Sequence, residues 1–121
     1  LIVRILEASQ VEELLDLCEE LKMDAMVEVH TESDMETALS IGASIIGINN
    51  RNLSSFATDI RTAMNMAARM AGGQIPVAAS GISSRKDIES NLEAGIHNFL
   101  IGERLVRADD PETFLKLLIS G

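Results

Sequence analysis

The chain has few of the residues that mark nucleic-acid-binding or membrane proteins. Its 121 residues include three Phe but no Tyr and no Trp, which largely excludes aromatic platforms for stacking bases or binding peptides. Nineteen acidic residues against ten basic ones give a formal net charge of -9, which disfavours binding to phosphate backbones or anionic lipid. No apolar run approaches the ~20 residues of a membrane span. We therefore expect no nucleic-acid partner, no membrane partner and a cytoplasmic location.

Cysteine and clusters of metal ligands are equally scarce. The single Cys18 cannot form an internal disulfide, and its place among leucines in a helical pattern predicts an inert core thiol. No metal-ligand spacing stands out. Gly72 and Gly73 follow a helix and precede a strand, which is the wrong side for a nucleotide loop. No His is placed to activate Ser80, so the sequence predicts neither a metal site nor covalent catalysis.

Short apolar strands instead alternate with amphipathic helices along the whole chain, whose hydrophobic content of 46% suits a globular domain. Five strands spaced by roughly 20 to 30 residues indicate a parallel sheet covered by helices, and so an α/β fold. An open doubly wound sheet and an eight-stranded barrel share this rhythm. The predicted strands are residues 1–6, 26–29, 45–48, 77–79 and 99–101, and the predicted helices are 9–21, 33–42, 59–70, 84–95 and one from 111.

Several predicted helices begin at recognisable caps. Ser9, with Glu12 three residues later, has the pattern of a capping box. Ser84 is a further N-cap candidate. Asp110 precedes Pro111, and proline is tolerated at the first helical position because no donor is needed there.

Polar or glycine residues follow every predicted strand, at the carboxyl end, where both architectures place their catalytic and ligand-binding residues. Their recurrence at all five strand ends favours the top face of a barrel, because in an open sheet the useful groups gather near one switch point. In chain order these residues are Arg4, Glu28, Asn49 with Asn50 and Arg51, Ser80 with Gly81, and Gly102 with Glu103.

Glu28 should emerge near the mouth of a mostly buried strand, where partial desolvation suits a carboxylate to proton transfer near neutral pH. The alternative is a carboxylate paired with a Lys or Arg on a neighbouring strand. Asn49 and Asn50 either orient a substrate hydroxyl or satisfy backbone groups of their loop, and spacing alone favours the loop role. His30, just past a strand, is predicted to be a solvated loop residue, with a substrate or partner contact as the alternative.

The last two strand ends form a pair. In barrels a phosphate often sits on backbone N–H groups after the last two strands, at the N-terminus of a short extra helix. Residues 103–107 leave room for such a turn. The alternative is that the glycines at 81 and 102 serve only tight turns, but their occurrence together favours phosphate binding.

The segments LIVRIL, VEVHTE, IGINNRNL, ASGISSRKDIE and FLIGERLVRADDP resemble, in that order, the second half of indole-3-glycerol phosphate synthase. The resemblance covers essentially the whole chain and implies that the five strands correspond to barrel strands four to eight. Residues 1–121 are then the C-terminal portion of a single (β/α)8 barrel domain, a partial barrel of five parallel strands with covering helices. The abrupt apolar start at residues 1–6 agrees, since it indicates that preceding sequence is missing.

The resemblance also implies a function. The family cyclises 1-(2-carboxyphenylamino)-1-deoxyribulose 5-phosphate to indole-3-glycerol phosphate, with loss of carbon dioxide and water, in tryptophan biosynthesis and without a metal or organic cofactor. On this resemblance Glu28 is the catalytic glutamate that exchanges a proton during dehydration, and Asn49 positions the substrate. The residues matched to the loops that hold the phosphosugar substrate are Ser80, Gly81, Gly102 and Glu103.

Two departures from the family predict that this chain alone is inactive. Ala79 stands where the family usually has a glutamate, and the first half of the barrel supplies the family's principal catalytic lysine. Two other interpretations stay open. One is a non-catalytic half barrel that self-associates through exposed sheet edges. The other is a different phosphate-binding barrel, such as phosphoribosylanthranilate isomerase.

Overall fold

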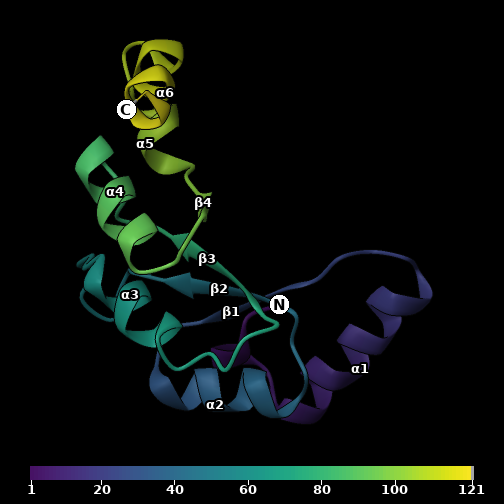
Figure 1. Cartoon of the computed structure of the whole chain (residues 1–121). Coiled ribbons are helices and arrows are strands. Elements are labelled where there is room, and N and C mark those ends of the chain that lie inside the picture. The colour runs from purple at the N-terminus through teal and green to yellow at the C-terminus, as the bar shows by residue number, and fades with distance from the viewer. Residues whose placement is uncertain (121) are drawn as a thin grey trace.

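The structure, a computed structural model, describes residues 1–120 and is built around one parallel sheet. Its strand order, β1-β2-β3-β4, follows the order of the chain, and all neighbouring strands are parallel. Figure 1 shows α2, α3 and α4 along one side of the sheet, with α1 projecting beyond one end and α5 and α6 beyond the other. The strands are β1 (Met26–Val29), β2 (Ile45–Asn49), β3 (Ile75–Ala79) and β4 (Asn98–Leu100).

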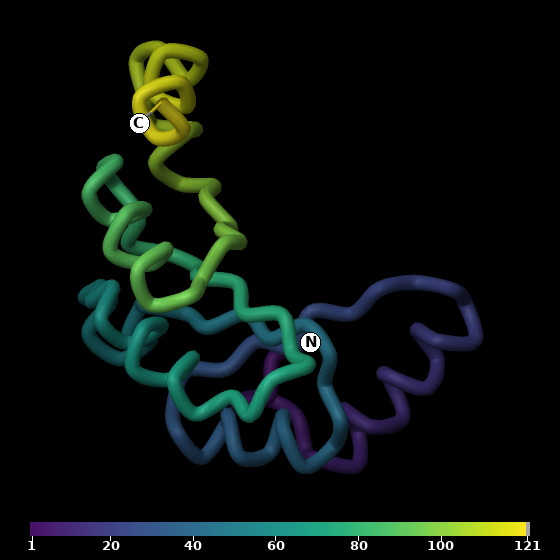
Figure 2. The backbone as a smooth tube through the Cα atoms, in the orientation of Figure 1, coloured from purple at the N-terminus to yellow at the C-terminus, as the bar shows by residue number. Residues whose placement is uncertain are grey.

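Six α-helices and one short 3-10 helix are described in residues 1–120. The helices are η1 (Val3–Ile5), α1 (Ala8–Glu20), α2 (Glu32–Ser40), α3 (Arg61–Ala67), α4 (Arg85–Glu93), α5 (Glu103–Val106) and α6 (Pro111–Ile119). The backbone follows an open arc, in which α1 and α6 lie apart at the two ends (Figure 2). This half-closed sheet with helices outside it has the architecture of a partial barrel.

The predicted strand at residues 1–6 is wrong, so the sheet described here has four strands and not five. Only Ile2 makes a parallel bridge, to Glu28, while Val3–Ile5 form the 3-10 helix η1. Leu1 still accepts a hydrogen bond of 2.6 Å from the backbone N–H of Glu28. A short apolar run without alternation does not distinguish a strand from a buried helical turn, and pairing here is limited to one bridge.

Side chains along each strand point alternately to the core face and to the open face of the sheet. Val27, Val29, Ile46 and Ile48 are fully buried on the side that packs against the helices. Glu28 and Asn49 occupy the alternate positions and so lie on the other face, because successive side chains of a strand point to opposite sides. The polar groups at the strand ends thus face away from the core.

Two predicted helix starts are confirmed, whereas the predicted start of α1 is wrong by two residues. Ser84 accepts from Asp87 N and caps α4, and Asp110 caps α6 ahead of Pro111. The predicted extra turn after Gly102 is present as α5. The cap of α1 is Glu7, whose backbone N–H donates to Gln10 Oε1 at 2.9 Å, so the Ser9 and Glu12 pattern lies inside the helix. The observed cap is a glutamate, which is not among the side chains that usually cap helices, so the Ser9 and Glu12 pattern placed the start too late.

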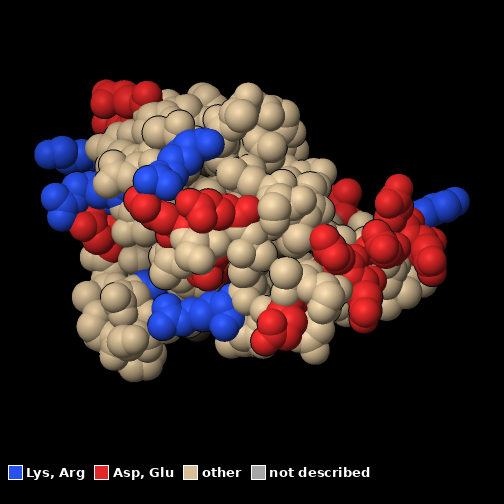
Figure 3. All heavy atoms as spheres, turned by 90° about the horizontal axis from the view of Figure 1, so that it is seen from below, with Lys and Arg blue, Asp and Glu red and all other residues tan. Residues whose placement is uncertain are grey.

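The surface reflects the charge balance of the sequence. Figure 3 shows acidic side chains gathered over the projecting α1, where five carboxylates are exposed. Cys18 on this helix is only half-buried, so it is less enclosed than predicted. No helix within residues 1–120 is long and apolar enough to cross a membrane.

Candidate active site

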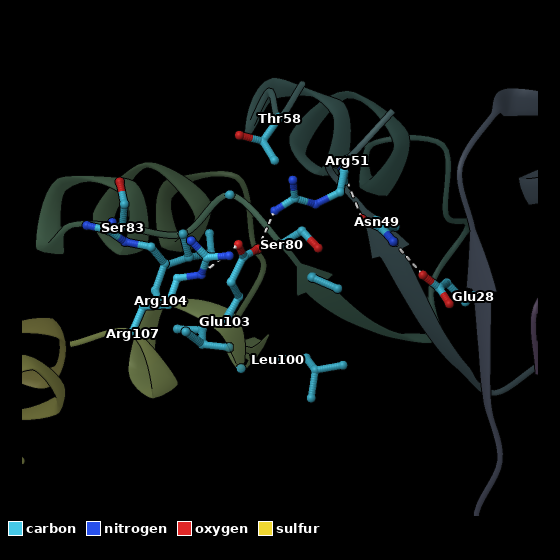
Figure 4. A pocket seen from close by; sticks show the side chains of 15 residues that line it. Glu28, Asn49, Arg51, Thr58, Ser80, Ser83, Leu100, Glu103, Arg104 and Arg107 are labelled. Carbon is cyan, nitrogen blue, oxygen red and sulfur yellow. Dashed lines mark hydrogen bonds and ion pairs between the residues drawn. The ribbon is translucent and has the colours of Figure 1, made fainter. Parts of the chain in front are cut away.

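An open pocket of about 680 Å³ lies along the carboxyl ends of the strands. Parallel strands bring these ends to one edge of the sheet, so residues far apart in sequence meet there. In Figure 4 Glu28 and Asn49 lie at one end of the pocket, and Glu103, Arg104 and Arg107 lie toward the other. All six predicted site residues line it: Glu28, Asn49, Ser80, Gly81, Gly102 and Glu103.

Glu28 and Asn49 form a hydrogen-bonded pair across β1 and β2. Asn49 Nδ2 donates to Glu28 Oε1 at 2.5 Å, and Asn49 Oδ1 accepts from the backbone N–H of Arg51 at 2.9 Å. These two bonds fix which way the Asn49 amide points. Within residues 1–120 no Lys or Arg forms an ion pair with Glu28, so the alternative of a carboxylate neutralised by a cation on a neighbouring strand is not met.

Asn50 has a different task from its neighbour. Its side chain is buried, and Nδ2 donates to Ser80 O at 3.1 Å while Oδ1 accepts from Ala63 N at 2.9 Å. These bonds tie the loop after β2 to the end of β3 and to α3. The loop role that spacing favoured for both asparagines therefore holds for Asn50, whereas Asn49 faces the pocket.

The far end of the pocket carries three arginines that the sequence analysis did not assign to a substrate-binding role. Arg51 Nη2 lies 2.7 Å from Glu103 Oε2, and Arg107 Nε lies 3.3 Å from Glu103 Oε1. Arg104 lines the same end, with its guanidinium 5.8 Å from the ring centroid of Phe114. The signal in the sequence was the placement of Arg51 directly after a strand and of two arginines three residues apart after Gly102.

The loop after β3 has an unusual backbone. Ser80 and Gly81 both have positive φ, 64° and 74°, and a non-glycine residue adopts that conformation at a cost. A Cβ on Gly81 would lie 3.1 Å from Thr58 Cβ, so both the backbone conformation and the packing favour glycine there. Gly102 differs, since its φ of -115° suits any residue and no atom lies within 4 Å of the place for a Cβ. A tight turn therefore does not explain Gly102.

Comparison with known proteins decides the family. The family model for indole-3-glycerol phosphate synthase matches residues 1–118. The chain belongs to the indole-3-glycerol phosphate synthase family. This membership displaces the alternative of a different phosphate-binding barrel.

Individual relatives of this family match over nearly the whole chain. The indole-3-glycerol phosphate synthase of Desulfosudis oleivorans is 53% identical over 120 residues, which cover 99% of this chain and 46% of that protein. That of Syntrophobacter fumaroxidans is 49% identical over 95% of this chain and 43% of its own length. A multifunctional tryptophan biosynthesis protein of Schizosaccharomyces pombe is 40% identical over 99% of this chain and 16% of its length. The chain thus spans under half the length of these relatives.

Solved structures agree on the fold. A native KDPGal structure has a TM-score of 0.64 at 16% identity, over 97% of this chain and 63% of that chain. Mandelate oxidase with benzoyl-formic acid has a TM-score of 0.67 at 20% identity, over 93% and 35%. These neighbours are TIM-barrel proteins, which confirms the predicted class, an α/β partial barrel.

Ala79, which the sequence analysis singled out, lines the pocket. It ends β3, pairs in register with Asn49 and is 5% exposed. A glutamate at this position would add a carboxylate to the pocket on the strand next to Asn49. Here the pocket end has one carboxylate, and the amide of Asn49 is its neighbour.

The prediction that His30 is solvated is wrong. Its side chain is only 4% exposed, and Nε2 lies 3.5 Å from Glu28 Oε1. His30 lines a second cavity of about 280 Å³, together with Arg4 and residues of the loop after β2. Residues of the loop at 49–59 line the same cavity, and the approach of so distant a segment cannot be read from the residues around His30. Within residues 1–120 no group of His, Cys, Asp and Glu could hold a metal ion.

Proposed function

We propose that the chain is the C-terminal portion of a complete (β/α)8 barrel that makes indole-3-glycerol phosphate in the cytoplasm. The reaction closes the ring of 1-(2-carboxyphenylamino)-1-deoxyribulose 5-phosphate and releases carbon dioxide and water. The observation that carries the proposal is one pocket with a carboxylate–amide pair at one end and three arginines at the other. The substrate matches this arrangement, because it has a reacting sugar carbon at one position and a negatively charged phosphate at its end.

At the reacting end Glu28 exchanges a proton with the substrate during dehydration, and Asn49 orients the substrate. The Asn49 hydrogen bond engages Oε1 of Glu28, and within residues 1–120 Oε2 makes no hydrogen bond. Oε2 is therefore the oxygen free to take or give a proton. A side chain 21% exposed keeps access to the pocket while losing part of its water.

At the other end the phosphate lies between the loop after β3 and the start of α5. Ser80 and Gly81 supply the first loop, and Gly102 allows the ligand to approach the backbone at the second. Glu103 contributes its backbone N–H, since its carboxylate repels a phosphate and already binds Arg51 and Arg107. Guanidinium groups supply the positive charge that a phosphate needs.

The chain alone is expected to be inactive. The family's principal acid is a lysine, and this chain has three lysines, Lys22, Lys86 and Lys116, none of which lines the described pocket. The complementary half of the barrel supplies the missing acid in this proposal. Ring closure and decarboxylation then depend on both halves.

The test is turnover of the carboxyphenylamino substrate by the full-length protein that contains this chain. Glu28→Gln should lower kcat by about 10²- to 10⁴-fold, the usual contribution of a general acid or base. Glu36→Gln, an exposed carboxylate on α2, is the matched control and should leave kcat unchanged. The proposal fails if the unsubstituted full-length protein forms no indole-3-glycerol phosphate.

A second candidate role is self-association of the half barrel. The outer edges of β1 and β4 lack a strand partner of their own length within residues 1–120, and large apolar side chains at the end of β4 and beyond it are exposed. These side chains are Leu100, Val106, Leu117 and Ile119, at 54%, 84%, 63% and 68% exposure. Sedimentation equilibrium of the 121-residue chain tests this role, and a monomer at high micromolar concentration would exclude it.

A further inference from the structure

Glu28 and His30 stand two residues apart at the end of β1, and the strand geometry brings their side chains together. Val27 and Val29 point into the core and are fully buried. Because side chains alternate along a strand, Glu28 and His30 share the opposite face. His30 Nε2 then lies 3.5 Å from Glu28 Oε1.

The imidazole of His30 is a buried polar group without a partner. Its side chain is 4% exposed, and neither Nδ1 nor Nε2 has a hydrogen bond within residues 1–120. Burying such a group unpaired is costly, and most buried polar atoms have partners. Glu28 Oε1 lies 3.5 Å from Nε2, just beyond the usual hydrogen-bond range of about 2.7–3.2 Å, and Glu28 is the one carboxylate within 4.0 Å of the ring nitrogens among the ion pairs of residues 1–120.

The backbone holds His30 in this position. Its N–H donates to Asp34 Oδ2 at 2.9 Å, and the same oxygen accepts from Thr31 N at 3.1 Å in the capping box of α2. The start of α2 thus fixes the residue that carries the ring. Residues of the loop at 49–59 line a cavity of about 280 Å³ together with His30.

We infer that His30 is a positioning residue for Glu28, with Nε2–H as a second donor to Oε1. Asn49 Nδ2 holds the same oxygen at 2.5 Å. Two donors on Oε1 leave Oε2 directed to the pocket as the single oxygen that exchanges a proton. This inference rests on the proposed role of Glu28 in proton exchange.

The test compares three variants of the full-length protein. His30→Phe fills a similar space without a donor, and kcat should fall about tenfold or more, as expected for one hydrogen bond to a charged group, while KM changes less than about twofold. His30→Gln restores a donor and should recover most of the rate. His97→Phe, which alters the only other histidine, at an exposed site before β4, is the control and should leave kcat unchanged.

A double substitution separates positioning from a structural role. In the Glu28→Gln background His30→Phe should cause no further loss of kcat, because there is no carboxylate to hold. Equal losses in both backgrounds, or an unchanged kcat in His30→Phe, would overturn the inference. Absence of turnover in the unsubstituted protein is a different result, since it overturns the proposed function.

A measurement on the 121-residue chain is independent of activity. ¹⁵N-edited NMR should show a His30 ring N–H at Nε2 that is protected from solvent exchange. Glu28→Leu should remove this protection while backbone amide signals of α2 stay in place. A ring that is protonated at Nδ1, or whose exchange is the same in Glu28→Leu, contradicts the inference.

Discussion

Arg51 and Glu103 form an ion pair of 2.7 Å that joins the loop after β2 to α5 across the mouth of the pocket. Their side chains are 30% and 51% exposed, so the pair adds little to stability. Its effect is electrostatic, since the same carboxylate also lies 3.3 Å from Arg107. Glu103 forms ion pairs with both arginines and so competes with an anionic ligand for their positive charge.

Removing this carboxylate should strengthen anion binding. We expect Glu103→Gln to bind inorganic phosphate about fivefold more tightly, equivalent to roughly 1 kcal/mol, because two guanidinium groups are released. Isothermal titration of the chain with phosphate measures the change. Glu112→Gln on α6, which also breaks an ion pair, is the control. Weaker or unchanged binding in Glu103→Gln would show that the arginines do not receive the phosphate.

The adjacent asparagines should separate stability from activity. Asn50→Ala leaves the N–H of Ala63 and the carbonyl of Ser80 without their partner and should lower the free energy of unfolding by about 2 kcal/mol. Asn49→Ala should cost less than about 1 kcal/mol, because its bonds lie at the pocket surface, but it should lower kcat of the full-length protein. Urea unfolding of the chain tests the two stability predictions, and turnover assays of the full-length protein test the activity prediction. A larger stability loss in Asn49→Ala would reverse their assigned roles.

Alanine substitutions at Gly81 and Gly42 test how closely Thr58 packs against the backbone of the pocket. Both have positive φ, 74° and 75°, so Ala should cost about 1 kcal/mol at either position through backbone strain. At Gly81 the added Cβ also meets Thr58, while at Gly42 no atom lies within 4 Å. Gly81→Ala should therefore destabilise by about 1 kcal/mol more than Gly42→Ala, as judged by urea unfolding. Equal losses would mean that the loop carrying Thr58 gives way easily.

Asp87 makes the start of α4 sensitive to acid. Partial burial, the largest single influence, raises the pKa of Asp87, but hydrogen bonds from Ser83 and Ser84 together lower it below the ordinary value of 3.8. A lowered pKa in the folded state gives stability that is present above pH 3.8 and is lost as the pH falls through the folded pKa. Asp87→Asn should cost about 1 kcal/mol near pH 7 and make the loss below pH 3.8 shallower.

Urea unfolding at a series of pH values measures this effect. Asp16→Asn is the matched control, because that carboxylate is exposed on α1 and makes none of the side-chain hydrogen bonds described in residues 1–120. If Asp87→Asn and the unsubstituted chain lose stability in parallel as the pH falls, the cap of α4 is not the acid-sensitive group.

The features that the sequence predicted well depend on neighbouring residues. The cap at Ser84 and the pair of Asp110 with Pro111 are local patterns, and α4 and α6 begin where they stand. The convergence of Glu28 and Asn49 followed from parallel strands, whose carboxyl ends share one edge. Both kinds of inference need no knowledge of how distant loops pack.

The features that sequence did not predict depend on distant segments. His30 shares a cavity with a loop that begins at residue 49, and the partner of Arg51 lies on α5, 52 residues further along the chain. The run at residues 1–6 is apolar enough for a strand, yet only Ile2 finds a partner in the sheet. Its conformation is decided by available hydrogen-bond partners and not by composition.

The strand order β1-β2-β3-β4, identical to the order of the chain, has a consequence for how this segment folds. Each strand pairs with the one made just before it, roughly 20 to 30 residues earlier, so no pairing in the described sheet waits for a strand made later. This sequential pairing allows each strand to add to a finished neighbour as synthesis proceeds. Hydrogen exchange during refolding should therefore find protection spreading across the sheet between adjacent strands.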